Sequence, residues 1–458
     1  MEREVTLMEM LEAREARVRR QDGFRERYGA PAVSFSLNIA GPVKDSPLIR
    51  RAFRAGQEQL EAGLRAAKLA VLDQAEYLAH TGCEALYAVE GTAREIKAVC
   101  VSIEDGSPMG RLFDMDVLDR DGRKLDREET GGEARKCIVC GAPGKGCASR
   151  RVHSAQEVRD AAQGILEVGF ASADRERTAA LATKALLDEA CTTPKPGLVD
   201  RAGSGSHRDM DIFTFTASAA ALAPYWGTCF AIGRETAGRS PAESFAALKR
   251  AGQRAERAMF AATGGVNTHK GAVFTLGTIC GAVGRLWRPE APCKDAETIL
   301  AECGAMASAA VEADFAALNV RTARTAGEKL YLEKGASGAR GEAARGFPGV
   351  SGTALPVLRQ AQAAGLSRND AGVAALLHLI ARGTDTNMIS RGGPARAARA
   401  AAACAQILKD RPLPGAEDAD RLDRDFIREN LSPGGCADLL AAAFFLRDWE
   451  DYIAQSCG

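Results

Sequence analysis

The chain has 458 residues, of which 46% are hydrophobic and 26% are charged, an ordinary composition for a globular protein. Sixty basic side chains balance sixty acidic ones, so the formal net charge is zero. A general nucleic-acid binder needs a surplus of Lys and Arg, and we expect no nucleic-acid partner. The length exceeds what one hydrophobic core usually supports, which predicts two domains.

The cysteines and the N-terminal segment indicate a cytoplasmic protein. Thirteen cysteines are scattered along the chain, an odd number without the spacing of a small disulfide scaffold. Residues 1–20 are charged throughout and lack the apolar core of a signal peptide. No apolar run approaches the length of a membrane span. We therefore expect reduced thiols, a cytoplasmic location and no membrane partner.

Residues 1–170 are predicted to form an α/β or α+β domain. Helical periodicity covers 7–20 and 47–68, and the second helix has Ser46 as a plausible N-cap and Pro47 at its first position. Residues 32–39 alternate as a strand does. Two further strands are predicted at 96–104 and 111–118.

Residues 177–458 are predicted to form an all-α domain, with the boundary between 169 and 177, where the sequence becomes polar. Small residues at Gly277, Gly281 and Gly284 indicate a buried central helix that packs at close backbone range. The apolar helical segments are 178–191, 212–225, 272–287, 298–320, 370–381 and 437–449.

Two carboxylates mark the first domain. In a strand at 111–118, Asp114 and Asp116 project from one face because side chains repeat every second residue. Paired carboxylates repel each other unless a cation lies between them, and Mg²⁺ prefers such oxygen ligands together with substrate phosphates. The pattern suits a nucleotidyltransferase-like domain, in which a metal neutralises departing pyrophosphate. The alternative is a polar strand edge that runs into a turn.

Two other motifs in this domain are open to two interpretations each. A Gly-Pro loop with Lys44 leads into a helix whose first turns carry Arg50, which is typical of an anion site or of a capped helix with a solvated face. Cys137, Cys140, Cys147 and His153 offer four ligands to a tetrahedral zinc ion, or they are ordinary reduced thiols beside a histidine.

Several polar loops interrupt the helices of the second domain. Each combines glycines with groups suited to phosphate, metal or ribose, so together they favour a nucleotide site over simple turns. The candidate residues in these loops are Lys195, His207, Asp209, Asp211, Asn267, His269, Lys270, Arg340, Glu342, Asp385, Asn387 and Arg391.

These motifs carry a resemblance to two known families. LNIAGPVKDSPLIRRAF, GRLFDMDVLD and CIVC resemble the phosphoribosyl-dephospho-coenzyme A transferases, also called holo-citrate lyase synthases. TPKPGLVDR, SHRDMD, GVNTHKGA, GARGEA-x-x-GFP, DTN-x-x-SRGG and NLSPGGCADLL are similar to the triphosphoribosyl-dephospho-coenzyme A synthases. Together the two stretches cover nearly the whole chain, in the order of fused bifunctional members.

The resemblance implies that the all-α domain joins ATP to 3′-dephospho-coenzyme A and releases adenine. Asp209, Asp211 and Asp385 are then candidate Mg²⁺ ligands or bases, and His207 or His269 is a candidate acid. The remaining loop residues are candidate substrate contacts, with the phosphates assigned to Lys195, Lys270, Arg340 and Arg391.

The resemblance also implies that the first domain transfers phosphoribosyl-dephospho-coenzyme A to a serine of the citrate lyase acyl carrier protein, with loss of pyrophosphate. Asp114 and Asp116 would then hold Mg²⁺. The triphosphate would be neutralised by Lys44, Arg50 and Arg111. Because carrier proteins are acidic, a basic cluster on the first helix is a candidate docking face, or else a solvated one; it consists of Arg14, Arg17, Arg19 and Arg20.

Three alternatives remain open from the sequence. The first domain is a carrier-docking module without activity, the helical domain hydrolyses nucleotide N-glycosides, or the carrier belongs to malonate decarboxylase, which uses the same prosthetic group.

Overall fold

A computed structural model describes residues 3–321, 323, 326–335 and 337–457. The chain divides into two compact units. The first comprises Met1–Ala173 with the short segments Pro289–Ala291 and Gln455–Gly458, and the second comprises Asp174–Arg288 and Pro292–Ala454. The division falls inside a continuous helix, α5 (Ala155–Cys191).

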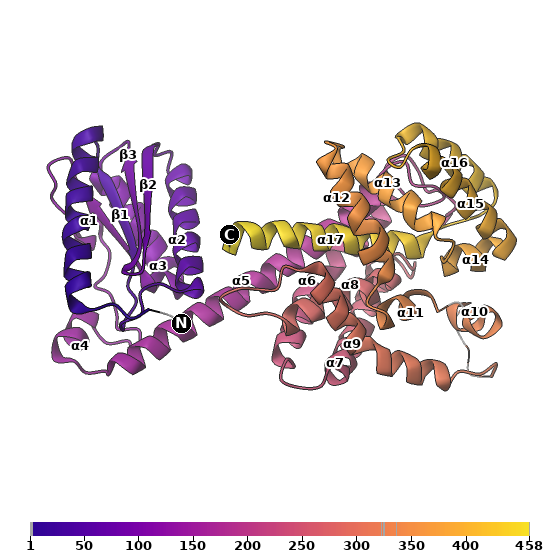
Figure 1. Ribbon diagram of the computed structural model, residues 1–458, viewed down its shortest axis with the longest axis horizontal. Helices are drawn as coiled ribbons and strands as arrows, with labels where there is room; N and C mark the ends of the chain where they lie inside the picture. The colour runs from indigo at the N-terminus through magenta and orange to yellow at the C-terminus, as the bar shows by residue number, and fades with distance from the viewer. Residues whose placement is uncertain (1–2, 322, 324–325, 336, 458) are drawn as a thin grey trace. The chain divides into compact units, whose positions relative to one another are not determined.

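The first unit contains a four-stranded sheet in the order β2-β3-β1-β4, with every neighbouring pair antiparallel. The sheet lies between α1 on one face and α2 with α3 on the other (Figure 1). Two 3₁₀ turns, Met109–Leu112 and Arg127–Thr130, flank β4. The elements are α1 (Leu7–Tyr28), β1 (Ala32–Leu37), α2 (Pro47–Ala66), β2 (Val71–Ala79), β3 (Gly82–Val89), α3 (Ala93–Gly106), β4 (Phe113–Leu118) and α4 (Gly144–Arg150).

The apolar core of this unit lies between the sheet and α2. Phe35 of β1 stacks on Phe53 of α2 with ring centroids 5.0 Å apart and meets Phe113 of β4 edge-on at 5.6 Å. Gly56 lets α2 approach, since a Cβ there would lie 2.2 Å from the Phe35 ring. Ser46 caps α2 as predicted, because its side chain accepts the N–H of Ile49.

The strand predicted at 96–104 is wrong, because these residues form most of α3. Their β-branched side chains suggested a strand, but the helix starts at a capping box: Thr92 accepts the N–H of Glu95, and Glu95 accepts that of Thr92 at 3.0 Å. The buried residues Ile96 and Cys100 are four apart, as on one helix face. The hairpin of β2 and β3 was not predicted.

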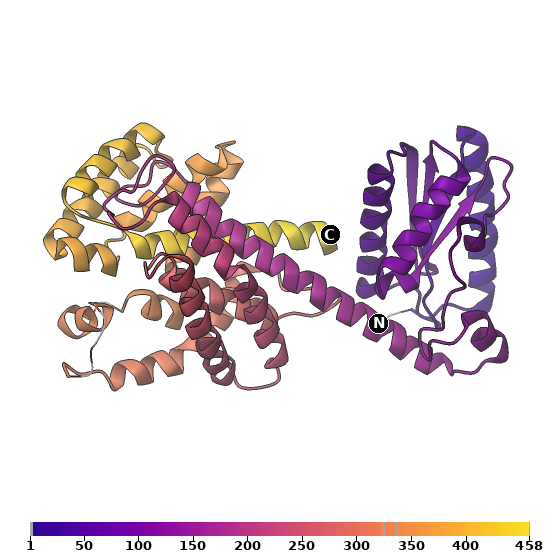
Figure 2. The same cartoon turned by 180° about the vertical axis from the view of Figure 1, so that it is seen from behind.

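The described part of the second unit contains only helices and loops, as the view from behind shows (Figure 2). A π-helical turn, Val350–Ala354, leads into α12. None of the helices in the described ranges is long and apolar enough to cross a membrane. After α5 come α6 (Ile212–Glu235), α7 (Pro241–Ala262), α8 (Lys270–Arg285), α9 (Ala296–Ala316), α10 (Ala326–Lys334), α11 (Gly338–Ala344), α12 (Leu355–Ala363), α13 (Arg368–Ala381), α14 (Thr386–Gly392), α15 (Pro394–Asp410), α16 (Ala416–Arg428) and α17 (Gly434–Cys457).

Helix α8 is the buried central helix that its glycines predicted. It packs against α6, α7 and α9. A Cβ at Gly284 would lie 2.1 Å from the Phe230 carbonyl oxygen of α6, and one at Gly277 would lie 2.3 Å from the Tyr225 hydroxyl. Such distances leave no room for a side chain, so the glycines are required by the close approach of α6 and α8.

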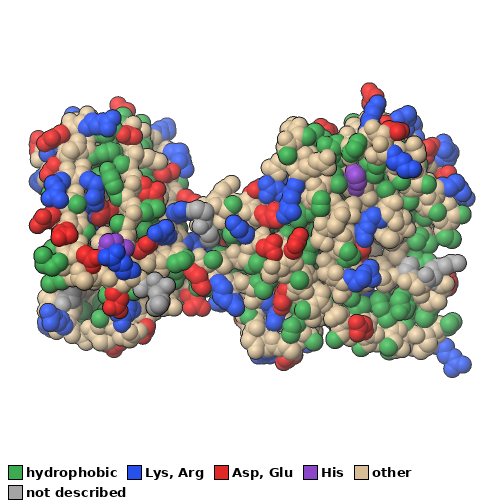
Figure 3. Space-filling model, in the orientation of Figure 1, with side chains coloured by type: hydrophobic (Ala, Val, Ile, Leu, Met, Phe, Trp, Pro, Cys, Tyr) green, Lys and Arg blue, Asp and Glu red, His purple; other side chains and the backbone are tan. Residues whose placement is uncertain are grey.

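Acidic and basic side chains are interspersed over the visible face of each unit (Figure 3). No broad surface of one charge is seen on this face.

Candidate functional sites

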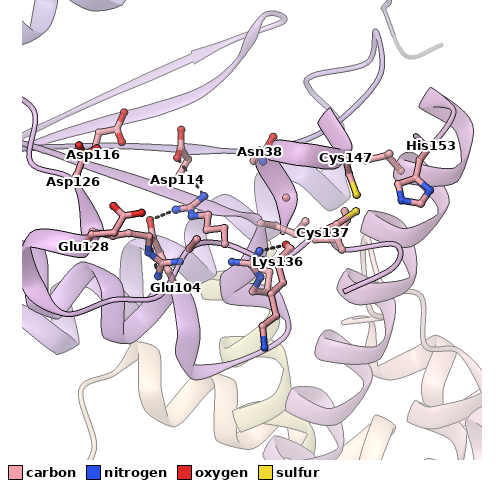
Figure 4. A pocket seen from close by; sticks show the side chains of 18 of the residues that line it. Asn38, Glu104, Asp114, Asp116, Asp126, Glu128, Lys136, Cys137, Cys147 and His153 are labelled. Carbon is pink, nitrogen blue, oxygen red and sulfur yellow. Dashed lines mark hydrogen bonds and ion pairs between the residues drawn. The ribbon is translucent and has the colours of Figure 1, made fainter. Parts of the chain in front are cut away.

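A cavity of about 1040 Å³ opens beside β4 in the first unit. Asp114 and Asp116 project into it from the same face of the strand, as predicted, with Asn38 nearby (Figure 4). The strand register places them opposite Ser36 and Ser34 of β1, so this face of the sheet is polar. The two carboxylates therefore line an open cavity.

Helix α3 holds the outer edge of β4. Lys97 donates to the Met115 carbonyl at 2.9 Å, and Glu104 accepts the Met115 N–H at 2.9 Å. Both side chains are buried, with 4% and 1% of their surface exposed. Because an edge strand leaves such backbone groups unpaired, these two contacts fix the strand that carries the aspartates.

The two aspartates differ in their surroundings. Asp116 is paired with Lys124 at 2.6 Å, whereas Asp114 lies 3.4 Å from Arg135. Burial, followed by the charge of Asp116, raises the pKa of Asp114 above its usual value. A cation between the two carboxylates would stabilise the ionised form of both, and their oxygens are the ligands that a hard cation prefers.

Seven basic and five acidic side chains line the cavity. Burial and the neighbouring charges of Arg135 and Arg127 lower the pKa of Arg111, while Arg127 and Arg135 are both paired with Glu104. Lys44 and Arg50, predicted to contact the same phosphates, do not line this cavity; Lys44 donates to the Ile39 carbonyl, and Arg50 is paired with Asp45 at 2.7 Å. The cavity's Lys and Arg residues are Lys97, Arg111, Lys124, Arg127, Arg135, Lys136 and Arg151.

The predicted docking face on α1 needs a correction. Arg17 and Arg20 are paired with Glu84 of β3, whose side chain is only 9% exposed. They tie α1 to the polar face of the sheet, so they are not free for a partner. Arg14 and Arg19 are exposed and remain candidates.

Cys137, Cys140, Cys147 and His153 come together at one side of the cavity. One ligand atom from each lies within 4.8 Å of all the others. The sulfurs of Cys137 and Cys147 lie side by side near the His153 ring (Figure 4). Within the ranges described above, this is the only group of three or more Cys, His, Asp or Glu side chains arranged to hold a metal ion.

A second cavity, of about 550 Å³, lies in the helical unit. Loops far apart in the sequence meet here, at the starts of α8, α11, α14 and α17. The structure thus brings together most of the predicted loop residues, namely Lys195, His207, Asp209, Asn267, His269, Lys270, Arg340, Asn387 and Arg391.

The cations of this cavity differ in their freedom to bind phosphate. Lys195 is 1% exposed, and its ammonium group lies 2.5 Å from Glu189. Lys270 is half exposed and paired with Glu256 at 3.1 Å, a contact that a ligand phosphate can replace. Lys195 therefore belongs to the buried frame of the cavity, while Lys270 lies at its rim.

His207 is held between two loops. Its Nε2 lies 2.9 Å from the Ser432 hydroxyl, and Nδ1 lies 3.5 Å from Arg391. Arg391 also donates to the Ser206 carbonyl at 2.6 Å and to Asn430 at 2.8 Å. Burial and then the charge of Arg391 lower the pKa of His207, so the imidazole is neutral at neutral pH and suited to accept a proton.

His269 is fully buried at the start of α8. Its Nδ1 lies 2.7 Å from the Ser218 hydroxyl, while its buried Nε2 has no partner in the described part of the protein. Burial, and then the charge of Lys195, lowers its pKa to about 3. A histidine with this pKa is not an imidazolium at neutral pH, so the acid role predicted for His269 is not supported.

Asp438 and Glu189, which line the cavity, were not among the predicted site residues. Burial raises the pKa of Asp438 well above its usual value, and the charges of Glu189 and Asp385 add to the rise. A Cβ at Gly271 would lie 1.9 Å from Asp438 Oδ2, which explains the glycine that follows Lys270. The NLSPGGCADLL motif contains Asp438 and was the available signal.

Three predicted residues, Asp211, Asp385 and Glu342, do not line the cavity and make structural contacts. Asp211 is exposed and caps α6 by accepting the N–H of Thr214 at 2.8 Å. Asp385 accepts the N–H groups of Met388 and Cys436 at 2.9 and 2.8 Å, which joins α14 to α17.

Glu342 pairs with Arg382 at 3.2 Å and accepts the Gly349 N–H at 2.8 Å. None of these three residues lines the cavity. Of the three predicted metal ligands or bases Asp209, Asp211 and Asp385, only Asp209 lines this cavity.

Comparisons with known proteins assign each unit to a class of transferase. Residues 5–168 match the family described as apo-citrate lyase phosphoribosyl-dephospho-CoA transferase. Residues 175–456 match the family described as ATP:dephospho-CoA triphosphoribosyl transferase. The chain is a bifunctional transferase of citrate lyase prosthetic-group biosynthesis.

Relatives match either nearly the whole chain or about two thirds of it. The chain is 32% identical to Protein CitXG of Leuconostoc mesenteroides subsp. cremoris, over 96% of this chain and 97% of that protein. Protein CitXG of Haemophilus influenzae is also 32% identical, over 96% of each chain. A probable 2-(5''-triphosphoribosyl)-3'-dephosphocoenzyme-A synthase of Albidiferax ferrireducens is 41% identical over 65% of this chain and 96% of its own length.

The chain therefore belongs to the ATP:dephospho-CoA triphosphoribosyl transferase family, in its fused form with an apo-citrate lyase phosphoribosyl-dephospho-CoA transferase. The resemblance drawn from the sequence motifs is confirmed.

Proposed function

We propose that the helical unit, residues 177–458, joins ATP to 3′-dephospho-coenzyme A. The ribose 2′-oxygen of dephospho-coenzyme A attacks C1′ of the ATP ribose, the bond from C1′ to adenine N9 breaks, and adenine leaves. The product keeps the triphosphate. The observation that carries this assignment is the second cavity, where a neutral histidine and a carboxyl group with a raised pKa lie among basic side chains.

The two proton transfers fit two residues of this cavity. His207 is the candidate base for the attacking hydroxyl, because burial keeps its imidazole neutral. Asp438 is the candidate acid for adenine, because its raised pKa keeps a proton available at higher pH than for an ordinary aspartate. A protonated purine leaves more readily as positive charge develops on the ribose.

The phosphates of ATP fit the basic rim of the same cavity. Lys270 and Arg340 are partly exposed there, and each is paired with an acidic neighbour, at 3.1 and 3.4 Å. Asp209 is the only predicted metal ligand of this unit that lines the cavity. It is our candidate contact for the Mg²⁺ that accompanies ATP.

We propose that the first unit, residues 1–170, is a nucleotidyltransferase-like domain that uses this product. A serine oxygen of the citrate lyase acyl carrier protein attacks the phosphorus next to the ribose, and pyrophosphate leaves. Arg111, Arg127 and Arg135 stabilise the charge of the triphosphate in the first cavity. The match of residues 5–168 to a transferase family disfavours a docking module without activity, and its description favours citrate lyase over malonate decarboxylase.

Asp114 and Asp116 would hold Mg²⁺ in the first cavity, and the ion would neutralise the leaving pyrophosphate. The fit rests on two carboxylates that share one strand face, one of them with a raised pKa. The free cysteines among the described residues suit a reducing cytoplasm, where this pathway would operate.

Adenine release tests the proposal for the helical unit. The purified chain is incubated with ATP, Mg²⁺ and dephospho-coenzyme A, each omitted in turn, and adenine is measured by chromatography. We expect adenine only when all three are present. Adenine without dephospho-coenzyme A would indicate a hydrolase, and no adenine from folded protein would reject the proposal.

A further inference from the structure

The group formed by Cys137, Cys140, Cys147 and His153 has the geometry of a metal site. Cys137 and Cys140 lie on a tight turn, in which the Cys137 N–H donates to the Ala142 carbonyl at 2.7 Å. In the same turn, the Gly141 N–H donates to the Cys137 carbonyl at 2.9 Å, and Gly141 has a positive φ of 73°. Cys147 follows in α4, and His153 precedes α5.

The distances within the group suit one tetrahedral ion. All four ligand atoms lie within 4.8 Å of one another, and the sulfurs of Cys140 and Cys147 are 3.5 Å apart. Zinc binds thiolates at about 2.3 Å, which places two sulfurs of a tetrahedral site about 3.8 Å apart. The four side chains are thus close to the required spacing.

A second observation points to a ligand. The Nε2 atom of His153 is buried and has no hydrogen-bond partner among the described residues. A buried ring nitrogen without a partner is costly, and a metal bond would satisfy it.

The group lies in the segment that forms one wall of the first cavity. Lys136, which precedes Cys137, accepts a hydrogen bond from Arg111 through its carbonyl. Arg135, one residue earlier, is paired with both Asp114 and Glu104. The segment from 119 to 154 contains only two short helical elements, and the Gly144 N–H donates to the Arg135 carbonyl at 2.8 Å, which ties Arg135 to the loop that carries the cysteines.

We propose that Cys137, Cys140, Cys147 and His153 bind one structural zinc ion, which holds the 134–154 segment against the first cavity and so positions Arg135 beside Asp114. Three thiolates and one neutral imidazole close the coordination shell, so the ion takes no direct part in the transfer.

Metal content of the full-length protein tests the proposal without relying on activity. The protein is expressed with zinc, purified without chelator and analysed by plasma mass spectrometry. We expect about one zinc per chain for the unchanged protein and for Cys293→Ser, a partly exposed cysteine outside the group. The zinc content per chain should be at least five-fold lower in Cys140→Ser and in His153→Ala, whereas His153→Cys should retain about one zinc per chain.

A second measurement needs no variant. Zinc removal from the unchanged protein should increase the number of thiols that react rapidly with a thiol reagent, and added zinc should reverse the increase. Zinc absent from the unchanged protein, or retained in Cys140→Ser, would overturn the proposal.

The positioning role has its own readout. Cys140→Ser should lower carrier modification at least ten-fold while adenine release by the same sample stays unchanged. Unchanged carrier modification in a zinc-free sample would overturn this role. If the proposed reactions fail but the zinc proposal is right, the protein will still contain about one zinc per chain. Failure of the proposed function can therefore be distinguished from failure of the zinc proposal.

Discussion

Replacing Lys195 by Met separates a structural ion pair from a phosphate contact. The Lys195 ammonium group is 1% exposed and lies 2.5 Å from Glu189, whose side chain is 4% exposed. The variant leaves the Glu189 carboxylate buried without its partner. Breaking a buried pair from one side costs about 3–5 kcal/mol, far more than the pair itself contributes.

Tryptophan fluorescence measures the loss of stability in the helical unit, where Lys195 and Glu189 lie. All three tryptophans, Trp226, Trp287 and Trp449, are buried in the helical unit, so urea unfolding followed by their emission reports on that unit alone. We expect the free energy of unfolding to fall by about 3–5 kcal/mol in Lys195→Met. The matched control is Lys184→Met on α5, the helix that also carries Glu189; the surface pairs of Lys184 should contribute at most about 1 kcal/mol.

The double variant Lys195→Met/Glu189→Gln completes the test. Because the second change removes the unpaired charge, we expect it to recover at least half of the lost stability. Adenine release measured on the double variant then shows whether Lys195 also contacts substrate. Equal destabilisation by Lys195→Met and Lys184→Met would refute the buried-pair reasoning.

Three further predictions concern the helical unit. Folding raises the pKa of Asp438, so ionisation of this carboxyl group opposes folding increasingly as pH rises above the pKa of an ordinary aspartate. Asp438→Asn should therefore raise the urea midpoint at pH 8, and the difference from the unchanged protein should shrink toward pH 4. The same variant should release adenine at least about 100-fold more slowly. His207→Gln should abolish the acidic limb of the pH–rate profile for adenine release, which we place below 6.5 because the pKa of His207 is lowered. Gly284→Ala puts a methyl group against the Phe230 carbonyl and should destabilise the unit by more than about 2 kcal/mol, whereas Gly352→Ala, in open space, should change stability by less than about 1 kcal/mol. A midpoint lowered by Asp438→Asn, an unchanged acidic limb, or equal effects of the two alanine variants would contradict these predictions.

The sequence predicted the parts of the fold that local pattern determines. The helical unit was clear because its apolar residues recur with helical spacing, and the glycines of α8 marked its buried position. The strand predicted over 96–104 is helix α3, and the capping box at Thr92 and Glu95 is the local signal that marks the start of this helix. Tertiary contacts could not be read from this pattern, so the β2–β3 hairpin was missed.

The sites were predicted as far as residue type and spacing allow. Asp114 and Asp116 share a strand face, which period-two alternation fixes locally. The different roles of Asp209, Asp211 and Asp385 depend on which backbone N–H groups lie nearby, and this follows only from how the helices pack. Asp438 acquires its raised pKa from burial and from residues far along the chain.

The most direct test of two successive reactions on one chain uses one variant in each cavity. Asp114→Asn and Asp438→Asn are assayed in parallel for adenine release and, with the citrate lyase acyl carrier protein, for the mass of the modified carrier. We predict that Asp114→Asn releases adenine at the unchanged rate but does not modify the carrier, whereas Asp438→Asn neither releases adenine nor modifies the carrier. Addition of the synthase product should restore carrier modification by Asp438→Asn. Loss of adenine release in folded Asp114→Asn, or carrier modification by that variant at the full rate, would contradict the assignment of one reaction to each unit.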